Sequence, residues 1–188
     1  MRKSSNIRKM TLSAMFLALG MVLPFLTGQI PQIGSMLLPM HIPVFFCGLI
    51  CGWQYGAIIG AILPLLRSSI FAMPPIFPTA SAMAFELMTY GLVSGLLWGL
   101  SKKQGLFALY RSLLISMILG RAVWGFVQFL QLSATGSAFT LEAFLAGAFL
   151  NSFPGIILQL VLIPVVMTAL DKSGILRYVR PEPISKEG

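Results

Sequence analysis

The chain has 188 residues, of which 57% are hydrophobic and 10% are charged, and its mean hydropathy is +0.89. Soluble domains carry about 25% charged residues, so this composition excludes a soluble globular protein and indicates an integral membrane protein. The net charge of +8 does not indicate nucleic-acid binding, because the basic residues flank apolar runs instead of gathering on one polar face.

Basic residues form three clusters along the chain. Eleven of the 13 Lys and Arg residues belong to them: Arg2, Lys3, Arg8 and Lys9; Lys102, Lys103 and Arg111; and Lys172, Arg177, Arg180 and Lys186. Segments rich in Lys and Arg remain on the cytoplasmic side of a membrane. We therefore expect all three clusters on that side, with an even number of membrane crossings between one cluster and the next.

Six apolar runs satisfy this condition, since a membrane-spanning helix needs roughly 20 residues. In chain order, we predict helices over residues 10–27, 39–52, 53–71, 79–100, 113–131 and 141–170. The second and third are short for full spans, so we expect this hairpin to be tilted or partly buried in protein. The sequence thus predicts an all-α integral membrane protein with six transmembrane helices and cytoplasmic N and C termini.

We expect one membrane domain over residues 1–188, made of a basic cytoplasmic N-terminus (1–9), a six-helix bundle (10–171) and a basic cytoplasmic tail (172–188). A cleaved signal peptide is the alternative for the first run, because a basic segment followed by an apolar run is also its signature. The run is long for a signal peptide, however, and the following LTGQIPQIGS has no convincing cleavage site.

Several polar residues interrupt the predicted helices, most of them near the external half. They are Arg67 in the third helix, Glu86 in the fourth, Arg121 and Gln128 in the fifth, and Asn151 in the sixth. An ionised side chain within a bilayer is costly and normally faces a partner, a ligand or a relay inside the bundle. We therefore expect these residues to form one polar layer.

Two interpretations of this layer remain open. Glu86 can pair with Arg67 or Arg121 and merely lock the bundle. Two arginines and one glutamate, however, leave a charge of +1, and a buried charge without a partner is unfavourable unless a counter-ion binds. An arginine fork suits a carboxylate, and nearby aromatic rings suit a ligand's carbon skeleton.

His41, between Pro39 and Pro43, can be a helix cap, a loop contact or a ligand group. With the neighbouring aromatic residues included, the candidate substrate-binding residues are Arg67, Glu86, Tyr90, Arg121, Trp124, Gln128, Asn151 and His41.

Other reactive groups do not form a recognisable site. Cys47 and Cys51 stand one helical turn apart with only His41 as a possible third metal ligand, so we interpret them as buried packing and expect no metal. The sequence contains no catalytic motif that we recognise and no phosphate-binding Gly-x-x-x-x-Gly-Lys-Ser/Thr loop. We expect neither an enzyme nor a bound cofactor, and we expect no ATP hydrolysis by this chain.

Small residues recur at four-residue spacing, which lets membrane helices approach closely. Two glycine rows have this spacing: Gly48, Gly52, Gly56 and Gly60, and Gly91, Gly95 and Gly99. Ala14 and Ala18 form an Ala-x-x-x-Ala pair near the cytoplasmic end of the first helix. Spacing alone would favour another internal seam for this pair.

The order of these features resembles the substrate-binding S components of energy-coupling factor (ECF) vitamin transporters. The shared features are six short helices, basic termini, a long first external loop and Ala-x-x-x-Ala in the first helix. The runs LPMHIPVFFCGLICGWQYG, AMAFELMTYGLVSGLL and GRAVWG also look like those of S components from Gram-positive bacteria. The resemblance covers essentially the whole chain.

This resemblance implies a multi-pass subunit of the bacterial plasma membrane that captures a vitamin from outside. A transmembrane coupling subunit and two ATPase subunits would supply the energy, and Ala14 and Ala18 would contact the coupling subunit. The resemblance does not fix the substrate. The net positive layer favours an anion, and pantothenate, with a carboxylate, hydroxyls and an amide, fits the polar residues; a pyridoxine-type vitamin is the close competitor.

Two functions from other classes remain as alternatives. A secondary transporter or channel acting alone would need a continuous polar path, yet the inner halves of the predicted helices are nearly all apolar. Uptake by the purified chain alone would favour it. A small intramembrane enzyme would need a nucleophile or metal constellation, for which an isolated Glu86 is weak support. Activity on a lipid without any partner would favour that alternative.

Overall fold

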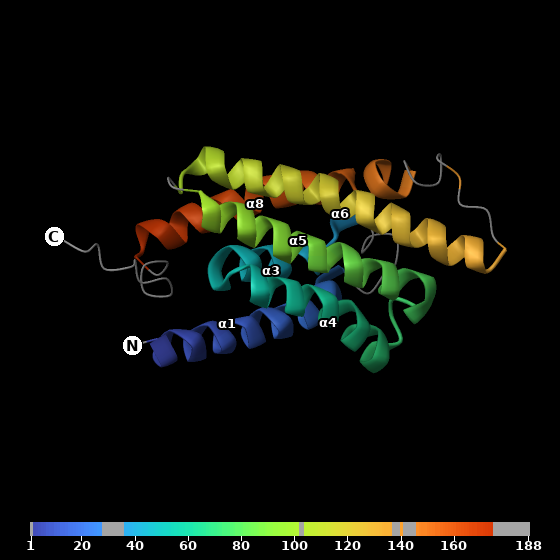
Figure 1. The fold of residues 1–188 in the computed structure, drawn as a ribbon, viewed down its shortest axis with the longest axis horizontal. Helices are drawn as coiled ribbons and strands as arrows, with labels where there is room; N and C mark the ends of the chain where they lie inside the picture. The colour runs from blue at the N-terminus through green and yellow to red at the C-terminus, as the bar shows by residue number, and fades with distance from the viewer. Residues whose placement is uncertain (1, 28–35, 102–103, 137–139, 141–145, 175–188) are drawn as a thin grey trace.

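The computed structural model describes residues 2–27, 36–101, 104–136, 140 and 146–174. These residues contain no strand, and the longer helices run side by side along one axis (Figure 1). The elements are α1 (Arg2–Val22), the 3₁₀-helix η1 (Leu23–Thr27), α3 (His41–Phe46), the π-helix η2 (Cys47–Cys51), α4 (Trp53–Phe71), the π-helix η3 (Ile76–Ala80), α5 (Ser81–Leu100), α6 (Leu106–Ala134), the π-helix η4 (Ala146–Leu150) and α8 (Phe153–Lys172).

Five described helical stretches are long and apolar enough to cross a membrane. They are Asn6–Leu26, Trp53–Phe71, Ile76–Leu100, Leu106–Ala134 and Phe153–Lys172. The second predicted helix is shorter: it consists of six α-helical and five π-helical residues, all buried. Its expected burial in protein is therefore confirmed, whereas six full spans are not.

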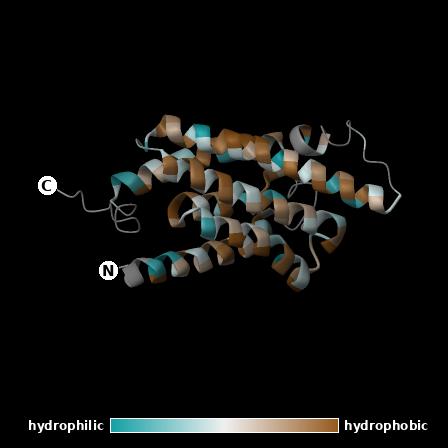
Figure 2. Cartoon of the chain, in the orientation of Figure 1, coloured by the Kyte–Doolittle hydropathy of each residue, from teal (hydrophilic) through white to brown (hydrophobic). Residues whose placement is uncertain are grey.

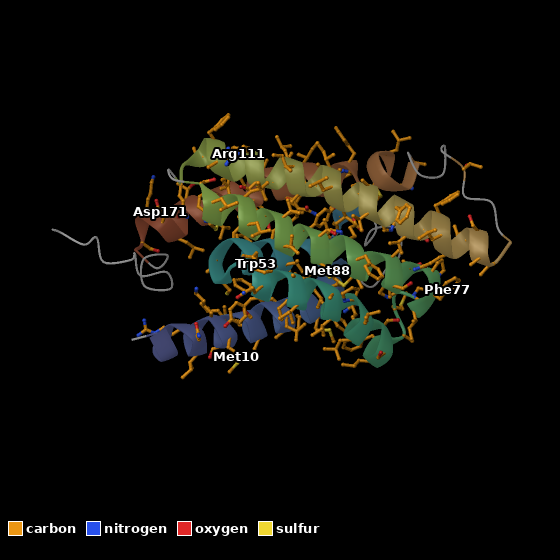
Figure 3. The ribbon with its side chains drawn as sticks, viewed as in Figure 1. Met10, Trp53, Phe77, Met88, Arg111 and Asp171 are labelled. Carbon is orange, nitrogen blue, oxygen red and sulfur yellow. The ribbon has the colours of Figure 1, made fainter. Side chains whose placement is uncertain are left out.

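Both ends of the described chain lie at the same end of the bundle. The starts of α1 and α6 and the ends of α5 and α8 lie on this side, and Figure 3 shows Met10, Arg111 and Asp171 toward this end and Phe77 at the opposite one. Figure 2 shows hydrophilic residues near the ends of α1 and α8 on the same side, with hydrophobic residues along the bundle between. We call this end of the bundle the basic end, because the three basic clusters lie in or next to the helix ends found there.

Helix boundaries differ from the prediction at three places. Helix α1 begins at Arg2 instead of Met10, and α6 begins at Leu106, seven residues before the predicted start, so Arg111 lies inside a helix. Helix α8 begins only at Phe153, with a proline in its first turn, where the missing N–H costs nothing. Asn151 therefore lies in the turn before α8 and not in the outer half of a helix.

The glycine rows form the closest helix contact in the core. A Cβ atom at Gly91 of α5 would overlap the backbone of Gly56 of α4, and one at Gly60 would overlap the backbone of Leu87. Gly52 is different, because it ends η2 with a φ of +107°, and a Cβ atom there would meet nothing within 4 Å. The expectation of internal packing therefore holds for most of the glycines, while Gly52 provides the left-handed backbone conformation between η2 and α4.

Helix α1 has one buried face and one exposed face. Ser13, Phe16 and Gly20 are buried against the bundle, whereas Ala14 and Ala18 are exposed. The Ala-x-x-x-Ala pair is therefore not an internal seam of the described chain.

Candidate functional site

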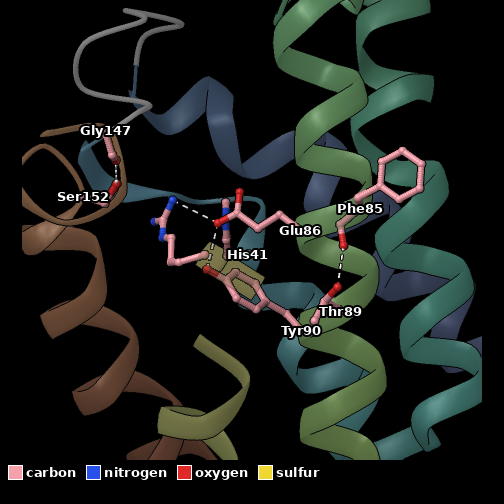
Figure 4. A network of polar contacts seen from close by, with 8 residues as sticks. His41, Phe85, Glu86, Thr89, Tyr90, Gly147 and Ser152 are labelled. Carbon is pink, nitrogen blue, oxygen red and sulfur yellow. Dashed lines mark hydrogen bonds and ion pairs between the residues drawn. The ribbon is translucent and has the colours of Figure 1, made fainter. Parts of the chain in front are cut away.

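Four polar side chains meet inside the bundle around the carboxylate of Glu86 (Figure 4). Arg121 Nη1 lies 2.9 Å from Glu86 Oε1, and the Tyr90 hydroxyl donates a hydrogen bond of 2.8 Å to the same oxygen. His41 Nε2 lies 3.6 Å from this oxygen, beyond ordinary hydrogen-bond distance. None of the four residues is more than 5% exposed. We call His41, Glu86, Tyr90 and Arg121 the polar cluster.

Three helices bring the polar cluster together. Glu86 and Tyr90 lie one turn apart on α5, Arg121 comes from α6, and His41 begins α3. The backbone N–H of His41 donates to the carbonyl of Leu38, which fixes the start of α3.

The Tyr90 ring is held by its neighbours on both sides. It stacks on Phe45, with 5.0 Å between ring centroids, and it occupies the space that a side chain on Gly120 would fill. The tyrosine hydroxyl is therefore directed at Glu86 by packing as well as by its hydrogen bond.

Arg121, and not Arg67, pairs with Glu86. Arg67 is also buried, but its Nη1 donates to the backbone carbonyl of Met21 at 2.6 Å. Its guanidinium lies 5.1 Å from the ring centroid of Phe25 and 5.2 Å from that of Phe71. Of the two pairings that the sequence left open, the structure has Glu86 with Arg121, and their charges balance. Arg67 instead ties α4 to the end of α1.

Part of the polar cluster lacks a hydrogen-bond partner. Within the described ranges, no partner is present for Arg121 Nε and Nη2 or for either ring nitrogen of His41. Buried polar groups are normally hydrogen-bonded, so such atoms indicate a place where a ligand or water binds. The Nε–H and Nη2–H groups of an arginine point the same way and form the fork that binds a carboxylate with two hydrogen bonds. Arg121 thus uses Nη1 for Glu86 and leaves its fork available.

Gln128 and Trp124 extend the site along α6 from Arg121. Gln128 lies seven residues beyond Arg121 on the same buried face, and its Oε1 lacks a partner among the described atoms. Trp124 is partly buried and packs on Gly147 of η4, because a Cβ atom there would lie 2.9 Å from its ring. Asn151, by contrast, is exposed, and the structure does not bring it to the polar cluster.

Sequence reasoning did not identify Gln159, another buried amide. Gln159 lies on α8, is 1% exposed, and has no partner for Nε2 in the part of the chain that the structure describes. The missed signal was its four-residue spacing from Gly155 and Ile163, both of which are buried. A polar residue in such a stripe faces the bundle and not the lipid.

The cysteines take no part in this site. Both are free and buried, and Cys47 Sγ lies 3.5 Å from the hydroxyl of Ser13 on α1. Over the described ranges no three His, Cys, Asp or Glu side chains are grouped as metal ligands.

The chain matches the model of one protein family. The family model described as "ECF transporter, substrate-specific component" matches residues 8–167, which include the whole polar cluster and Gln159. The comparisons with curated proteins and with solved structures gave no match.

Proposed function

Because the chain belongs to the substrate-specific components of ECF transporters, we propose that it binds a small carboxylate-bearing vitamin with high affinity, with pantothenate favoured. This is a family of transporter subunits that take up vitamins or related micronutrients, and not of enzymes. In the proposed scheme, the chain resides in a bacterial plasma membrane with its basic end in the cytoplasm. It passes the vitamin to a coupling module with one transmembrane subunit and two ATPase subunits.

One observation supports the carboxylate most directly. The fork of Arg121 lies in a buried cluster without a protein partner in the described residues, while Nη1 of the same side chain pairs with Glu86, which also accepts a hydrogen bond from Tyr90. A group already fixed by its neighbours loses little freedom when a ligand binds, which favours high affinity. The fork then selects a planar anion over a neutral hydroxyl group.

The remaining residues suit the rest of such a molecule. Gln128 Oε1 can accept a hydrogen bond from a hydroxyl or amide of the vitamin, and a ring nitrogen of His41 can donate or accept one. Trp124 provides ring surface one turn from Arg121. Arg67 and Asn151 are outside this proposal, because Arg67 binds the end of α1 and Asn151 is exposed.

Ala14 and Ala18 belong to a different part of the proposal. Both are exposed on α1, so a helix of the coupling subunit can approach them closely.

The proposed sidedness is tested with an impermeant thiol reagent on cells after Cys47 and Cys51 are replaced. A single cysteine at Ser173 should be protected, and one at Thr135, at the opposite end, should react.

The vitamin assignment is tested by calorimetry of the purified protein with pantothenate, its alcohol analogue pantothenol, and pyridoxine. We expect the tightest binding for pantothenate. Arg121→Lys keeps the charge beside Glu86 but lacks the fork, so it should weaken pantothenate binding by about ten- to a hundred-fold and pantothenol binding much less. Arg111→Lys, the same substitution at the basic end of α6, is the matched control and should bind normally.

Two results would contradict parts of this proposal. Tight pyridoxine binding without pantothenate binding would exclude the carboxylate. Normal pantothenate binding by Arg121→Lys would place the substrate away from the polar cluster.

A further inference from the structure

Gln159 is an unusual residue to find buried in a membrane-spanning helix. It lies on the buried face of α8 one turn after Gly155, where a Cβ atom would overlap the backbone of Met36 and Leu37 just before α3. One turn later on the same face, Ile163 belongs to the hydrophobic core. The Gln159 side chain is thus directed into the bundle, and its Nε2 has no acceptor among the described residues.

Contacts at the start of α8 place Gln159 near the depth of Arg121. Ser152 donates a hydrogen bond to the carbonyl of Gly147, and Gly147 packs on Trp124. Helices α6 and α8 run in opposite directions (Figure 1). Both lengths are counted from this level toward the basic end, at about 1.5 Å per helical residue. Gln159 lies seven residues after Ser152 on α8, about 10 Å along the helix axis. Arg121 lies three residues before Trp124 on α6, about 4.5 Å along the axis. The two residues therefore lie within about 6 Å of each other in depth.

We propose that Gln159 is a substrate-binding residue and that the bound vitamin joins α8 to α6. This inference rests on the proposed function and extends it. The carboxylate of the vitamin occupies the fork of Arg121, and a carbonyl or hydroxyl oxygen further along the molecule accepts a hydrogen bond from Gln159 Nε2. Gln159 Nε2, which has no acceptor among the described residues, gains one when the vitamin binds, which makes this hydrogen bond favourable.

The chain offers a matched pair of variants to test this role. Gln159→Met removes an amide whose Nε2 has no described partner, whereas Gln131→Met removes an amide that donates to Ser81 Oγ at 2.9 Å. We expect Gln159→Met to lower pantothenate affinity about ten-fold while the melting temperature of the free protein stays equal or rises. Gln131→Met should do the opposite, with a lower melting temperature and unchanged affinity.

Hydrogen exchange tests whether the vitamin joins the two helices. Pantothenate should slow amide exchange in the first half of α8 in the wild-type protein, and this protection should be reduced in Gln159→Met. Equal pantothenate affinity in wild type and Gln159→Met, or unchanged exchange in α8 on binding, would overturn the inference while leaving the proposed function intact if Arg121→Lys still binds weakly. If the wild-type protein binds no pantothenate and no small molecule co-purifies with it, both are wrong.

Discussion

Two buried arginines show how much the role of a residue depends on its surroundings. Arg67 and Arg121 both interrupt apolar helices, and the sequence treats them alike. In the structure, Arg121 meets a carboxylate, while Arg67 meets a backbone carbonyl and two aromatic rings. The partner of Arg67 was not predictable, because every residue carries a carbonyl group and the sequence does not reveal which helix end is close. Cation–π contacts further stabilise a guanidinium without any counter-ion.

Arg67→Met should therefore reduce stability and not substrate binding. Loss of the charged hydrogen bond to Met21 is expected to lower the free energy of unfolding by about 1.5–3 kcal/mol. Thermal melting in detergent should show this decrease, while calorimetry with pantothenate should show unchanged affinity. Arg111→Met is a suitable control, since Arg111 makes its hydrogen bond to Ser101 at an exposed position. A loss of affinity without a change in melting temperature would return Arg67 to the substrate site.

The polar cluster itself was partly predictable from the sequence. Glu86, Tyr90 and Arg121 were expected together because charges within a bilayer need partners and Tyr90 is one helical turn from Glu86. Gln159 was not predicted because residues 150–170 carry no charged residue that would mark a polar face on this helix. Its importance becomes visible only when its burial and its missing hydrogen-bond partner are known.

At the scale of the helices, hydropathy predicted which segments enter the bundle but not where they end. The length of an apolar run reflects how much of the segment contacts lipid. The helix itself can be longer, because it extends until a residue ends it. Helices α1 and α6 therefore extend past the apolar runs, because no Pro or Gly intervenes at their starts. The short helix of α3 and η2 was harder to predict, since a buried segment and a lipid-spanning segment are equally apolar.

The glycine contact between α4 and α5 gives a prediction with an internal control. Gly91→Ala would place a methyl group in the backbone of Gly56, and overpacking of this kind costs about 1–3 kcal/mol of stability. Gly99→Ala, on the same helix, meets nothing within 4 Å. We expect a lower melting temperature for the first variant and an equal or higher one for the second. Equal melting temperatures would show that α4 and α5 are not in this close contact.

At the scale of the whole molecule, we propose that the exposed face of α1 binds the coupling subunit and takes no part in substrate binding. Trp at Ala14 or Ala18 should prevent close approach of a coupling-subunit helix, because both positions are exposed in the free chain. We expect these variants to bind pantothenate normally and to melt normally, but to lose vitamin uptake in cells and co-purification with the ATPase complex. Met15→Trp is the control for added bulk on α1, because Met15 is also exposed and lies between the two alanines in the sequence. Normal uptake by both alanine variants would refute the coupling role.

The packing of the whole bundle positions the polar cluster and Gln159. Close packing of α5 against α4 and α6 holds Glu86 and Arg121 in place, and the buried α3 brings His41 to them. Helix α8 closes the other side with an amide whose Nε2 has no partner within the described structure. We propose that this buried set of groups binds one small carboxylate-bearing vitamin.

Mass spectrometry of the small molecules that co-purify with the protein from vitamin-rich medium tests this binding. We expect one bound carboxylate-bearing vitamin in the wild-type protein and much lower occupancy in Arg121→Lys, with Arg111→Lys occupied like wild type. A wild-type protein without any bound vitamin, or equal occupancy in Arg121→Lys, would contradict it.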